Sequence, residues 1–254
     1  MPDTVDPQLT AWIETVVVEG ERFGVVAQQL ATGRTPVQGG LDVRVPWVPD
    51  WTARDLVEHL GGVHRWVLGI LRAGSTEPPP RSPAHPSPDD VHGWFAVGLS
   101  ELVATLRDID PAAPAWHMSP TAPKVARSWA RRQAHEHVVH RLDLEAAAGV
   151  AHEPVDPVIT EDGVDELLRI VVPRWAHTEP LASARGTVAV HATDTGRSWL
   201  VELGPGRSRT TDGAAAADCS VSGTAEQLLR RLWGRPAEVS LDGDPAVEAR
   251  LRGR

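Results

Sequence analysis

The segment from Ala126 to Gly149 restricts the possible folds of this chain more than any other. Its sequence, ARSWARRQAHEHVVHRLDLEAAAG, has the length of a helix and ends on glycine, a common stop signal. It concentrates ionisable side chains at His135, Glu136, His137, His140, Asp143 and Glu145. Polar groups are costly to bury without partners, so this helix has to bring them against other polar groups or a metal ion.

Two of these side chains, Glu136 and His140, are predicted to share the inward side of the helix. They are four residues apart, which separates them by about 40° around the helix axis. Arg131, Arg141 and Glu145 fall on nearly the opposite side, which we expect to be the charged face. An inward carboxylate and imidazole favour a shared divalent metal, and the alternative is a buried His–Glu hydrogen bond without metal. The spacing HExxxH differs from the HExxH of zinc proteases.

A third metal ligand, His59, is expected from an earlier helix that begins after Thr52, a good N-cap. The apolar stripe of that helix consists of Leu56, Leu60, Val63, Val67 and Ile70. His59 falls inside this stripe and is predicted to point into the core, whereas His64 lies nearer its edge. Three protein ligands, His59, Glu136 and His140, leave a coordination position open for catalysis.

The remaining candidate side chains are not predicted to be metal ligands or catalytic groups. His135 and His137 are predicted to face the side surfaces of their helix, and His117 to be exposed in a loop. Asp143 is expected either to hold a ligand imidazole by a hydrogen bond or to form a surface ion pair. Cys219 lies in a predicted strand and is interpreted as a small buried residue rather than a catalytic thiol.

The hydrophobic pattern divides the chain into a helical part and a mixed part. Before Gly149 the apolar residues recur at helical spacing, and after it a period of two alternates with further helices. Helices are predicted at residues 7–32, 52–72, 90–106, 127–149 and 164–175 and after Thr224, and strands at 187–193, 198–203, 218–222 and 238–241. We therefore expect an α+β protein with a four-helix domain at residues 1–150 and a small α/β domain at 151–254.

The composition limits which partners the protein binds and in which cellular compartment it is expected. A net charge of −9 argues against a nucleic-acid partner, and the single cysteine excludes an intramolecular disulfide. The N-terminus has none of the features of a signal peptide, and no window approaches the roughly 20 apolar residues of a membrane span. A cytoplasmic protein is expected. Only one of the 25 basic residues is lysine, a bias typical of a high-GC genome.

Three motifs resemble the mycothiol-dependent maleylpyruvate isomerase family. They are PDWTARDLVEHLGGVHRW, SWARRQAHEHVVHRLDLEAAAG, and LLRRLWGRP followed by LDGDP, and they span most of the chain in the family's order. The resemblance implies a DinB-like four-helix bundle that binds a divalent metal, usually zinc, followed by an α/β domain similar to sterol-carrier folds. His137 departs from the family pattern, in which a small residue is usual at that position.

The resemblance also implies a site and a reaction. The family's metal ligands match His59, Glu136 and His140, and its catalytic arginine from the C-terminal domain matches Arg235 or Arg231. The cosubstrate implied is mycothiol, the low-molecular-weight thiol of actinobacteria, whose thiolate attacks a small electrophile in an isomerisation or an S-transfer. The expected partners are therefore mycothiol and a small electrophile, without nucleic acid or membrane, in a monomer or weak dimer.

Three alternatives stay open at this stage. A metal-dependent hydrolase uses the same ligands with water in the open position. A lipid or small-molecule carrier has a long apolar tunnel and no metal. A structural metal is enclosed by a fourth protein ligand, which here is His64 or His135.

Overall fold

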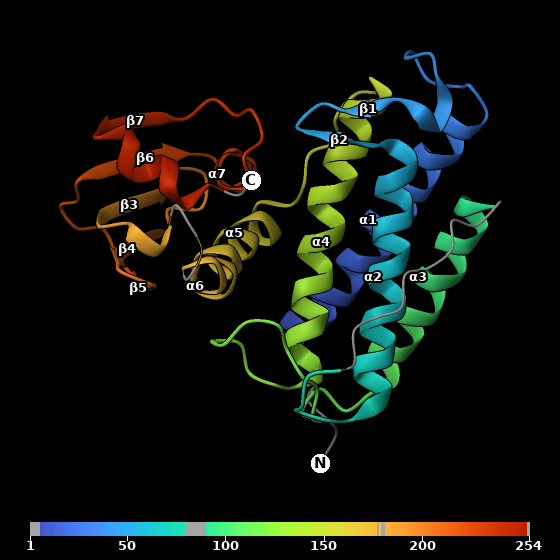
Figure 1. Ribbon diagram of the computed structural model, residues 1–254, viewed down its shortest axis with the longest axis horizontal. Coiled ribbons are helices and arrows are strands. Elements are labelled where there is room, and N and C mark those ends of the chain that lie inside the picture. The colour runs from blue at the N-terminus through green and yellow to red at the C-terminus, as the bar shows by residue number, and fades with distance from the viewer. Residues whose placement is uncertain (1–5, 80–89, 177, 179–180, 253–254) are drawn as a thin grey trace. The chain divides into compact units, whose positions relative to one another are not determined.

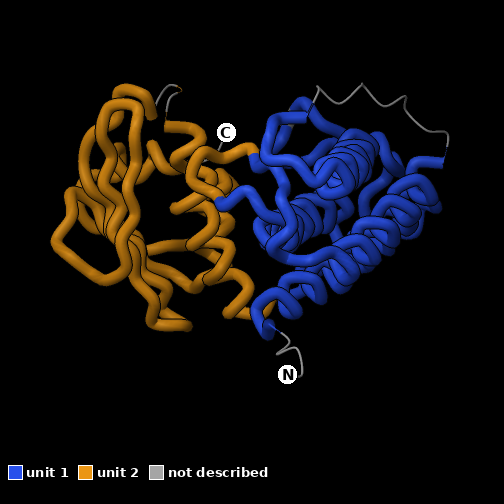
Figure 2. The backbone as a smooth tube through the Cα atoms, turned by 90° about the horizontal axis from the view of Figure 1, so that it is seen from below, with its two compact units in different colours: residues 1–117, 123–154 blue, residues 118–122, 155–254 orange. Residues whose placement is uncertain are grey.

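The computed structural model of the chain describes residues 6–79, 90–176, 178 and 181–252 (Figure 1). The chain divides into two compact units, shown in different colours in Figure 2. Unit 1 comprises Met1–His117 and Pro123–Pro154, and unit 2 comprises Met118–Ala122 and Val155–Arg254. A short piece of the connection between two helices of unit 1 therefore belongs to unit 2.

The described residues of unit 1 form a bundle of four α-helices (Figure 1). They are α1 (Pro7–Ala31), α2 (Ala53–Ala73), α3 (Val91–Asp108) and α4 (Ala126–Ala148). Helix α1 packs against α3 and α4, and α2 packs against the same two helices. Between α1 and α2 the chain forms a short 3₁₀ turn, Gly40–Asp42, and an antiparallel ribbon of β1 (Arg44–Val45) and β2 (Val48–Thr52). The ribbon lies at the end of the bundle where α2 begins.

The ends of the helices follow local chemistry. Thr52 caps α2 as predicted: its side chain accepts from the Asp55 backbone N–H, and the Asp55 carboxylate accepts from the Thr52 backbone N–H. Gly149 ends α4 at a φ of 65°, a left-handed conformation that glycine adopts without strain. The boundaries of the four predicted helices are therefore confirmed to within a few residues.

The core of the bundle is mainly apolar. The largest apolar side chains fully buried in it are Phe23, Leu30, Leu56, Leu60, Ile70, Phe95, Leu102, Trp129 and Leu144. Phe23 of α1 and Phe95 of α3 lie with their ring centroids 4.9 Å apart. Among the described helices, none combines the length and the apolar character that crossing a bilayer requires.

The charged face predicted for α4 is not solvated. Arg141 is fully buried, with its Nε 2.6 Å from a Glu19 carboxylate oxygen of α1 and its Nη1 2.8 Å from Glu145. Arg141 Nη1 also donates to the Glu153 carbonyl oxygen at 2.6 Å. Helix α1 covers this side of α4, and the buried charges are tolerated because Arg141 pairs with both carboxylates and Arg22 also pairs with Glu19. The prediction of an outward charged face is wrong for Arg141 and Glu145, which are buried, whereas Arg131 is partly exposed.

Unit 2 is built on a five-stranded mixed sheet of order β5-β4-β3-β6-β7. The strands are β3 (Gly186–Ala192), β4 (Ser198–Gly204), β5 (Arg207–Asp212), β6 (Cys219–Gly223) and β7 (Ser240–Gly243). Strands β3 and β4 form an antiparallel hairpin, and β3 pairs with β6 in parallel. Between them these elements confirm the predicted fold class, α+β with a helical bundle followed by an α/β part.

The helices of unit 2 are α5 (Pro157–Glu166), α6 (Val172–Trp175), α7 (Ala225–Leu232) and α8 (Pro245–Glu248), with 3₁₀ turns at Leu181–Ser183 and Ala249–Leu251. A π-helical turn, Leu167–Val171, joins α5 to α6. Helix α5 starts at Pro157, seven residues before the predicted start at 164, because Asp156 caps it and proline suits the first helical position. Strand β5 was not predicted, since its sequence RSRTTD has no apolar alternation.

The π-helical turn leaves backbone carbonyls that hydroxyl side chains satisfy. Ser119 donates to the Ile170 carbonyl oxygen at 2.7 Å, and Thr121 donates to that of Arg169 at 2.8 Å. Thr210 of β5 donates to the Leu168 carbonyl oxygen at 3.0 Å. The first two hydroxyls come from the segment Met118–Ala122, which explains why this segment belongs to unit 2.

Candidate metal centre

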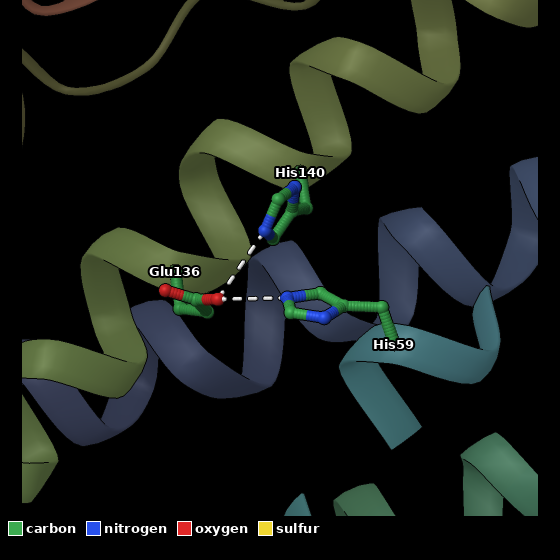
Figure 3. Close-up of side chains that lie close together, drawn as sticks. All are labelled: His59, Glu136 and His140. Atoms are coloured by element: carbon green, nitrogen blue, oxygen red, sulfur yellow. Dashed lines mark hydrogen bonds and ion pairs between the residues drawn. The ribbon is translucent and has the colours of Figure 1, made fainter. Parts of the chain in front are cut away.

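The three predicted ligands meet between α2 and α4. In Figure 3, His59 of α2 points at Glu136 and His140, which project from successive turns of α4. One carboxylate oxygen of Glu136 lies 3.3 Å from His59 Nε2 and 3.2 Å from His140 Nε2. One atom from each residue can be chosen so that all lie within 4.8 Å of one another. Two imidazole nitrogens and a carboxylate oxygen converging in this way form a donor set suited to zinc and its neighbours.

The three side chains differ in how far they are exposed. The side chain of His59 is 33% exposed, compared with 17% for Glu136 and 14% for His140. Trp51 packs against the His59 ring, with the ring centroids 4.8 Å apart. His59 is therefore the ligand candidate nearest the surface, and the two on α4 lie deeper.

The predicted orientations of His59 and His64 are reversed in the structure. His64 is fully buried, whereas His59 lies at the rim of the metal centre. Helix α3 approaches α2 closely at two glycines: a Cβ on Gly98 would lie 3.1 Å from His64 Nδ1, and one on Gly61 would clash with Trp94. This close packing turns the face of α2 that carries His64 toward α3.

A second layer of polar side chains surrounds the two ligands of α4. Arg132 Nη2 donates to the other carboxylate oxygen of Glu136 at 2.6 Å. Asp143 Oδ2 lies 3.3 Å from His140 Nδ1, and the indole N–H of Trp47 donates to Asp143 Oδ1 at 2.9 Å. Asp143 is fully buried, so of its two predicted roles the structure shows the hydrogen bond to an imidazole and not a surface ion pair.

Sequence reasoning missed two members of this layer. Arg132 lies four residues before Glu136, so helical spacing was a sufficient signal for it. Trp47 lies 96 residues before Asp143 in the chain, in the turn between β1 and β2, and no local pattern connects the two.

These contacts set the charges at the centre. Burial opposes ionisation of Glu136, but Arg132 and the hydrogen bonds from His140 and His59 hold its pKa well below the usual value. Burial also opposes a charged His140, yet the hydrogen bonds to Asp143 and Glu136 raise its pKa to about 9. Glu136 is thus a carboxylate at neutral pH, and a cation binding through His140 Nε2 has to replace a proton.

A separate pair of histidines lies in the core. His137 Nε2 and His64 Nε2 are 2.9 Å apart, and their rings are stacked at 8°. Burial lowers the pKa of His137 to about 4, and burial together with His137 lowers that of His64 well below its usual value. His137 Nδ1 lies 2.7 Å from the Gln133 carbonyl oxygen, to which it donates. The prediction that His135 and His137 face side surfaces is wrong, because both are fully buried.

The remaining predicted residues lie apart from this centre or in unit 2. His117 is buried against Trp129, with ring centroids 4.9 Å apart, so its predicted exposure is wrong. Cys219 is buried as predicted, and burial raises the pKa of its thiol. Arg231 donates to both carboxylate oxygens of the buried Glu248, at 3.0 and 3.1 Å. Arg235 follows the end of α7 and donates to the Trp233 carbonyl oxygen.

Known proteins resemble both parts of the chain. Residues 25–145 match the family model described as "Mycothiol maleylpyruvate isomerase N-terminal domain", and residues 159–250 match the one described as "MDMPI C-terminal domain". A crystal structure of the mycothiol-dependent maleylpyruvate isomerase is 14% identical, with 92% of each chain covered and a TM-score of 0.64. A histidine-to-alanine mutant of that isomerase is 13% identical, with the same coverage and a TM-score of 0.65.

At these identities the two solved structures show a shared fold. A search among curated proteins finds no match.

Proposed function

The chain belongs to the mycothiol-dependent maleylpyruvate isomerase family, and on that premise we propose that it is an enzyme that uses a divalent metal ion and mycothiol to transform a small electrophile. The observation that carries the proposal is the convergence of His59, Glu136 and His140 from two helices onto one point. A centre with three protein ligands and an exposed rim is the arrangement of catalytic rather than structural metals.

The metal proposed is zinc. The side chains that would hold it are His59 and His140 through Nε2 and Glu136 through the oxygen that faces both histidines. Nickel and other divalent ions bind the same donor types, so the measurement of metal content has to include them.

The protein's own side chains prepare the centre for a thiol. When bound, a divalent cation lowers the pKa of a coordinating thiol, so that mycothiol reacts as the thiolate at neutral pH. Arg132 keeps Glu136 ionised, and the exposed edge of His59 leaves a path for a bulky thiol. In the proposed step the thiolate sulfur adds to an electrophilic carbon of a conjugated double bond, and the electron pair of the broken π bond moves onto the substrate as an enolate. If the enolate expels the thiolate again, the double bond re-forms and the net reaction is an isomerisation. If the enolate is protonated instead, the carbon–sulfur bond persists and the reaction is an S-transfer.

We propose Arg235, rather than Arg231, as the arginine of unit 2 that binds negative charge on the substrate. Arg231 is held by both oxygens of a buried carboxylate, which assigns it to the packing of unit 2. Arg235 follows directly on the left-handed Gly234 that ends α7, and it is partly exposed. An arginine in that position is suited to stabilising a carboxylate or an enolate oxygen. Substituting Arg235 by Met is expected to raise KM or lower kcat without changing metal content.

The test measures metal content and turnover on the same preparations. Purified protein is expected to carry one divalent ion per chain and to transform electrophiles only when mycothiol is present. Glu136→Ala and His140→Ala are expected to lose both the metal and the activity. Stoichiometric metal with full thiol-dependent activity in both variants would overturn the proposal. Turnover without any thiol would identify a metal-dependent hydrolase instead.

A further inference from the structure

Helix α4 carries a buried carboxylate behind one of the proposed ligands. Asp143 lies three residues after His140 and therefore on the same side of the helix. Its Oδ2 faces His140 Nδ1 at 3.3 Å, while His140 Nε2 faces Glu136 at 3.2 Å. A carboxylate oxygen can only accept, so the ring with both protons donates from Nδ1 to Asp143 and from Nε2 to Glu136. A cation that binds at Nε2 replaces the proton on that nitrogen, and Nδ1–H keeps its bond to Asp143.

A tryptophan from outside the helix fixes the same carboxylate. Trp47 lies in the turn between β1 and β2, and β1 contacts α4. Its indole N–H donates to Asp143 Oδ1 at 2.9 Å, so one carboxylate oxygen of Asp143 accepts from Trp47 and the other accepts from His140. Since Asp143 is fully buried, water does not compete for these contacts. Trp47, Asp143 and His140 thus form a continuous chain of hydrogen-bonding groups.

The β1–β2 ribbon also reaches the ligand on the other helix. Strand β2 ends at Thr52, the N-cap of α2, and His59 follows about two turns later. Trp51 of β2 packs against the His59 ring. The ribbon therefore contacts residues of both helices that carry ligands: Trp47 contacts Asp143 of α4, and Trp51 contacts His59 of α2.

From this arrangement we infer that Asp143 and Trp47 are positioning residues of the metal centre: Asp143 holds His140 with Nε2 directed at the metal, and Trp47 holds Asp143. This inference rests on the proposed function, because it assigns partners to a ligand of the proposed metal. Partners of this kind orient ligand imidazoles in metalloproteins, and their loss typically weakens metal binding about 10–100-fold.

The test uses Co²⁺ as a visible probe of affinity and geometry. Apo-protein is titrated with Co²⁺ while the visible absorption is recorded, and the affinity is confirmed by competition with a chromophoric chelator. Asp143→Ala is expected to weaken binding about 10–100-fold and to change the absorption band. Asp143→Asn, whose amide oxygen can still accept from Nδ1–H, is expected to fall between wild type and Asp143→Ala. Trp47→Phe is expected to weaken binding less than Asp143→Ala does.

A matched control separates positioning from general destabilisation. Trp199 donates its indole N–H to Asp165 at 2.9 Å in unit 2, which is the same kind of bond at the same length. Trp199→Phe is expected to lower the stability of the chain and to leave Co²⁺ affinity unchanged. In the double variant Trp47→Phe/Asp143→Ala, affinity is expected to equal that of Asp143→Ala alone, because Trp47 acts only through Asp143.

The outcomes distinguish the two proposals. If wild type binds one Co²⁺ with high affinity but Asp143→Ala and Trp47→Phe do so equally well, the positioning role is overturned and the metal centre stands. Additive effects of the two substitutions overturn the role of Trp47. If wild type takes up no Co²⁺, Zn²⁺ or Ni²⁺, the metal centre fails and the positioning role fails with it. Circular dichroism checks that each variant is folded, and Trp47→Phe remains decisive if Asp143→Ala does not fold.

Discussion

His64 and His137 share a hydrogen bond between their Nε2 atoms, 2.9 Å apart, in the core of the helical unit. Because His137 Nδ1 donates to a backbone carbonyl oxygen, its Nε2 is the acceptor, and His64 Nε2 carries the shared proton. The bond in this form requires His137 to be neutral, and burial lowers the pKa of His64 well below its usual value as well. It lies beside the proposed metal centre, since His137 follows Glu136 directly in the chain.

The neutral histidine pair makes the fold sensitive to acid. The unfolded chain takes up protons at these histidines near pH 6.5, whereas burial keeps the pKa of His137 at about 4 in the folded chain. The unfolded state therefore binds more protons between these values, and the free energy of unfolding falls as the pH drops from 6.5 towards 4. Urea denaturation at pH 7, 5.5 and 4.5 measures this dependence.

The variant His137→Leu is expected to separate hydrogen bonding from protonation. At pH 7 it should be less stable by about 1–3 kcal/mol, because the His64 N–H loses its acceptor in the core. Its further loss of stability on acidification should be smaller than that of wild type. A decline as steep as that of wild type would contradict the assignment of His137 as a neutral buried group.

The buried ion-pair network of Arg141 predicts a large and local stability effect. Arg141→Met leaves the carboxylates of Glu19 and Glu145 buried with less neutralising charge, and it is expected to destabilise the chain by about 3–5 kcal/mol. Arg22 pairs with Glu19 from a position where its side chain is 39% exposed, so Arg22→Met is expected to change stability by only about 0–1 kcal/mol. Thermal and urea denaturation of both variants provide the comparison, and similar effects from the two substitutions would refute it.

Metal binding is expected to depend on pH through His140. Below its pKa of about 9, a cation has to displace one proton, so affinity should rise about tenfold per pH unit from neutral pH and level off near pH 9. In the metal-free chain the same raised pKa stabilises the fold below the unfolded value of 6.5. That stabilisation is lost as the pH rises through about 9. Calorimetric titration with Zn²⁺ in buffers of different ionisation enthalpy counts the released proton, and a pH-independent affinity would rule the assignment out.

The two capping boxes allow each unit to be weakened separately. Thr52→Ala removes the cap of α2, and Thr224→Ala removes the equivalent cap of α7, whose partner is Gln227. Each substitution is expected to cost about 1 kcal/mol. Hydrogen exchange should show faster opening of α2 in the first variant and of α7 in the second. Because α2 carries His59, only Thr52→Ala is expected to weaken metal binding, and equal effects of both on the metal would argue against this.

The features of the fold that depend on residues close together in the sequence could be predicted. Thr52 and Asp55 are three residues apart, and their capping box requires no information from elsewhere in the chain. Spacing alone predicts that Glu136 and His140 share a helix face, and the position of His59 in a second helix, together with the family resemblance, predicts the third ligand. The structure places all three together.

The incorrect predictions concern contacts between helices or segments that are far apart in the sequence. A helical projection gives the angles between side chains but not the direction of the neighbouring helix, so His59 and His64 were assigned to the wrong sides of α2. The spacing in α4 predicts Arg141 on a charged face, because its partner Glu19 lies 122 residues earlier and gives no local signal. Trp47 was missed for the same reason, since its contact with Asp143 spans 96 residues.

The segment Met118–Ala122 limits where the chain can be cut to express the two units separately. The polypeptide passes from one unit to the other at three points in its sequence, not one. An expression fragment that begins at residue 151 lacks the hydroxyls of Ser119 and Thr121 and leaves two carbonyls of the π-helical turn without those donors. A fragment that ends at residue 150 retains the segment Met118–Ala122 but lacks the rest of unit 2, with which this segment packs. A cut at this position therefore removes native contacts from the second unit, so a fragment for expression of unit 2 has to supply Ser119 and Thr121 as well.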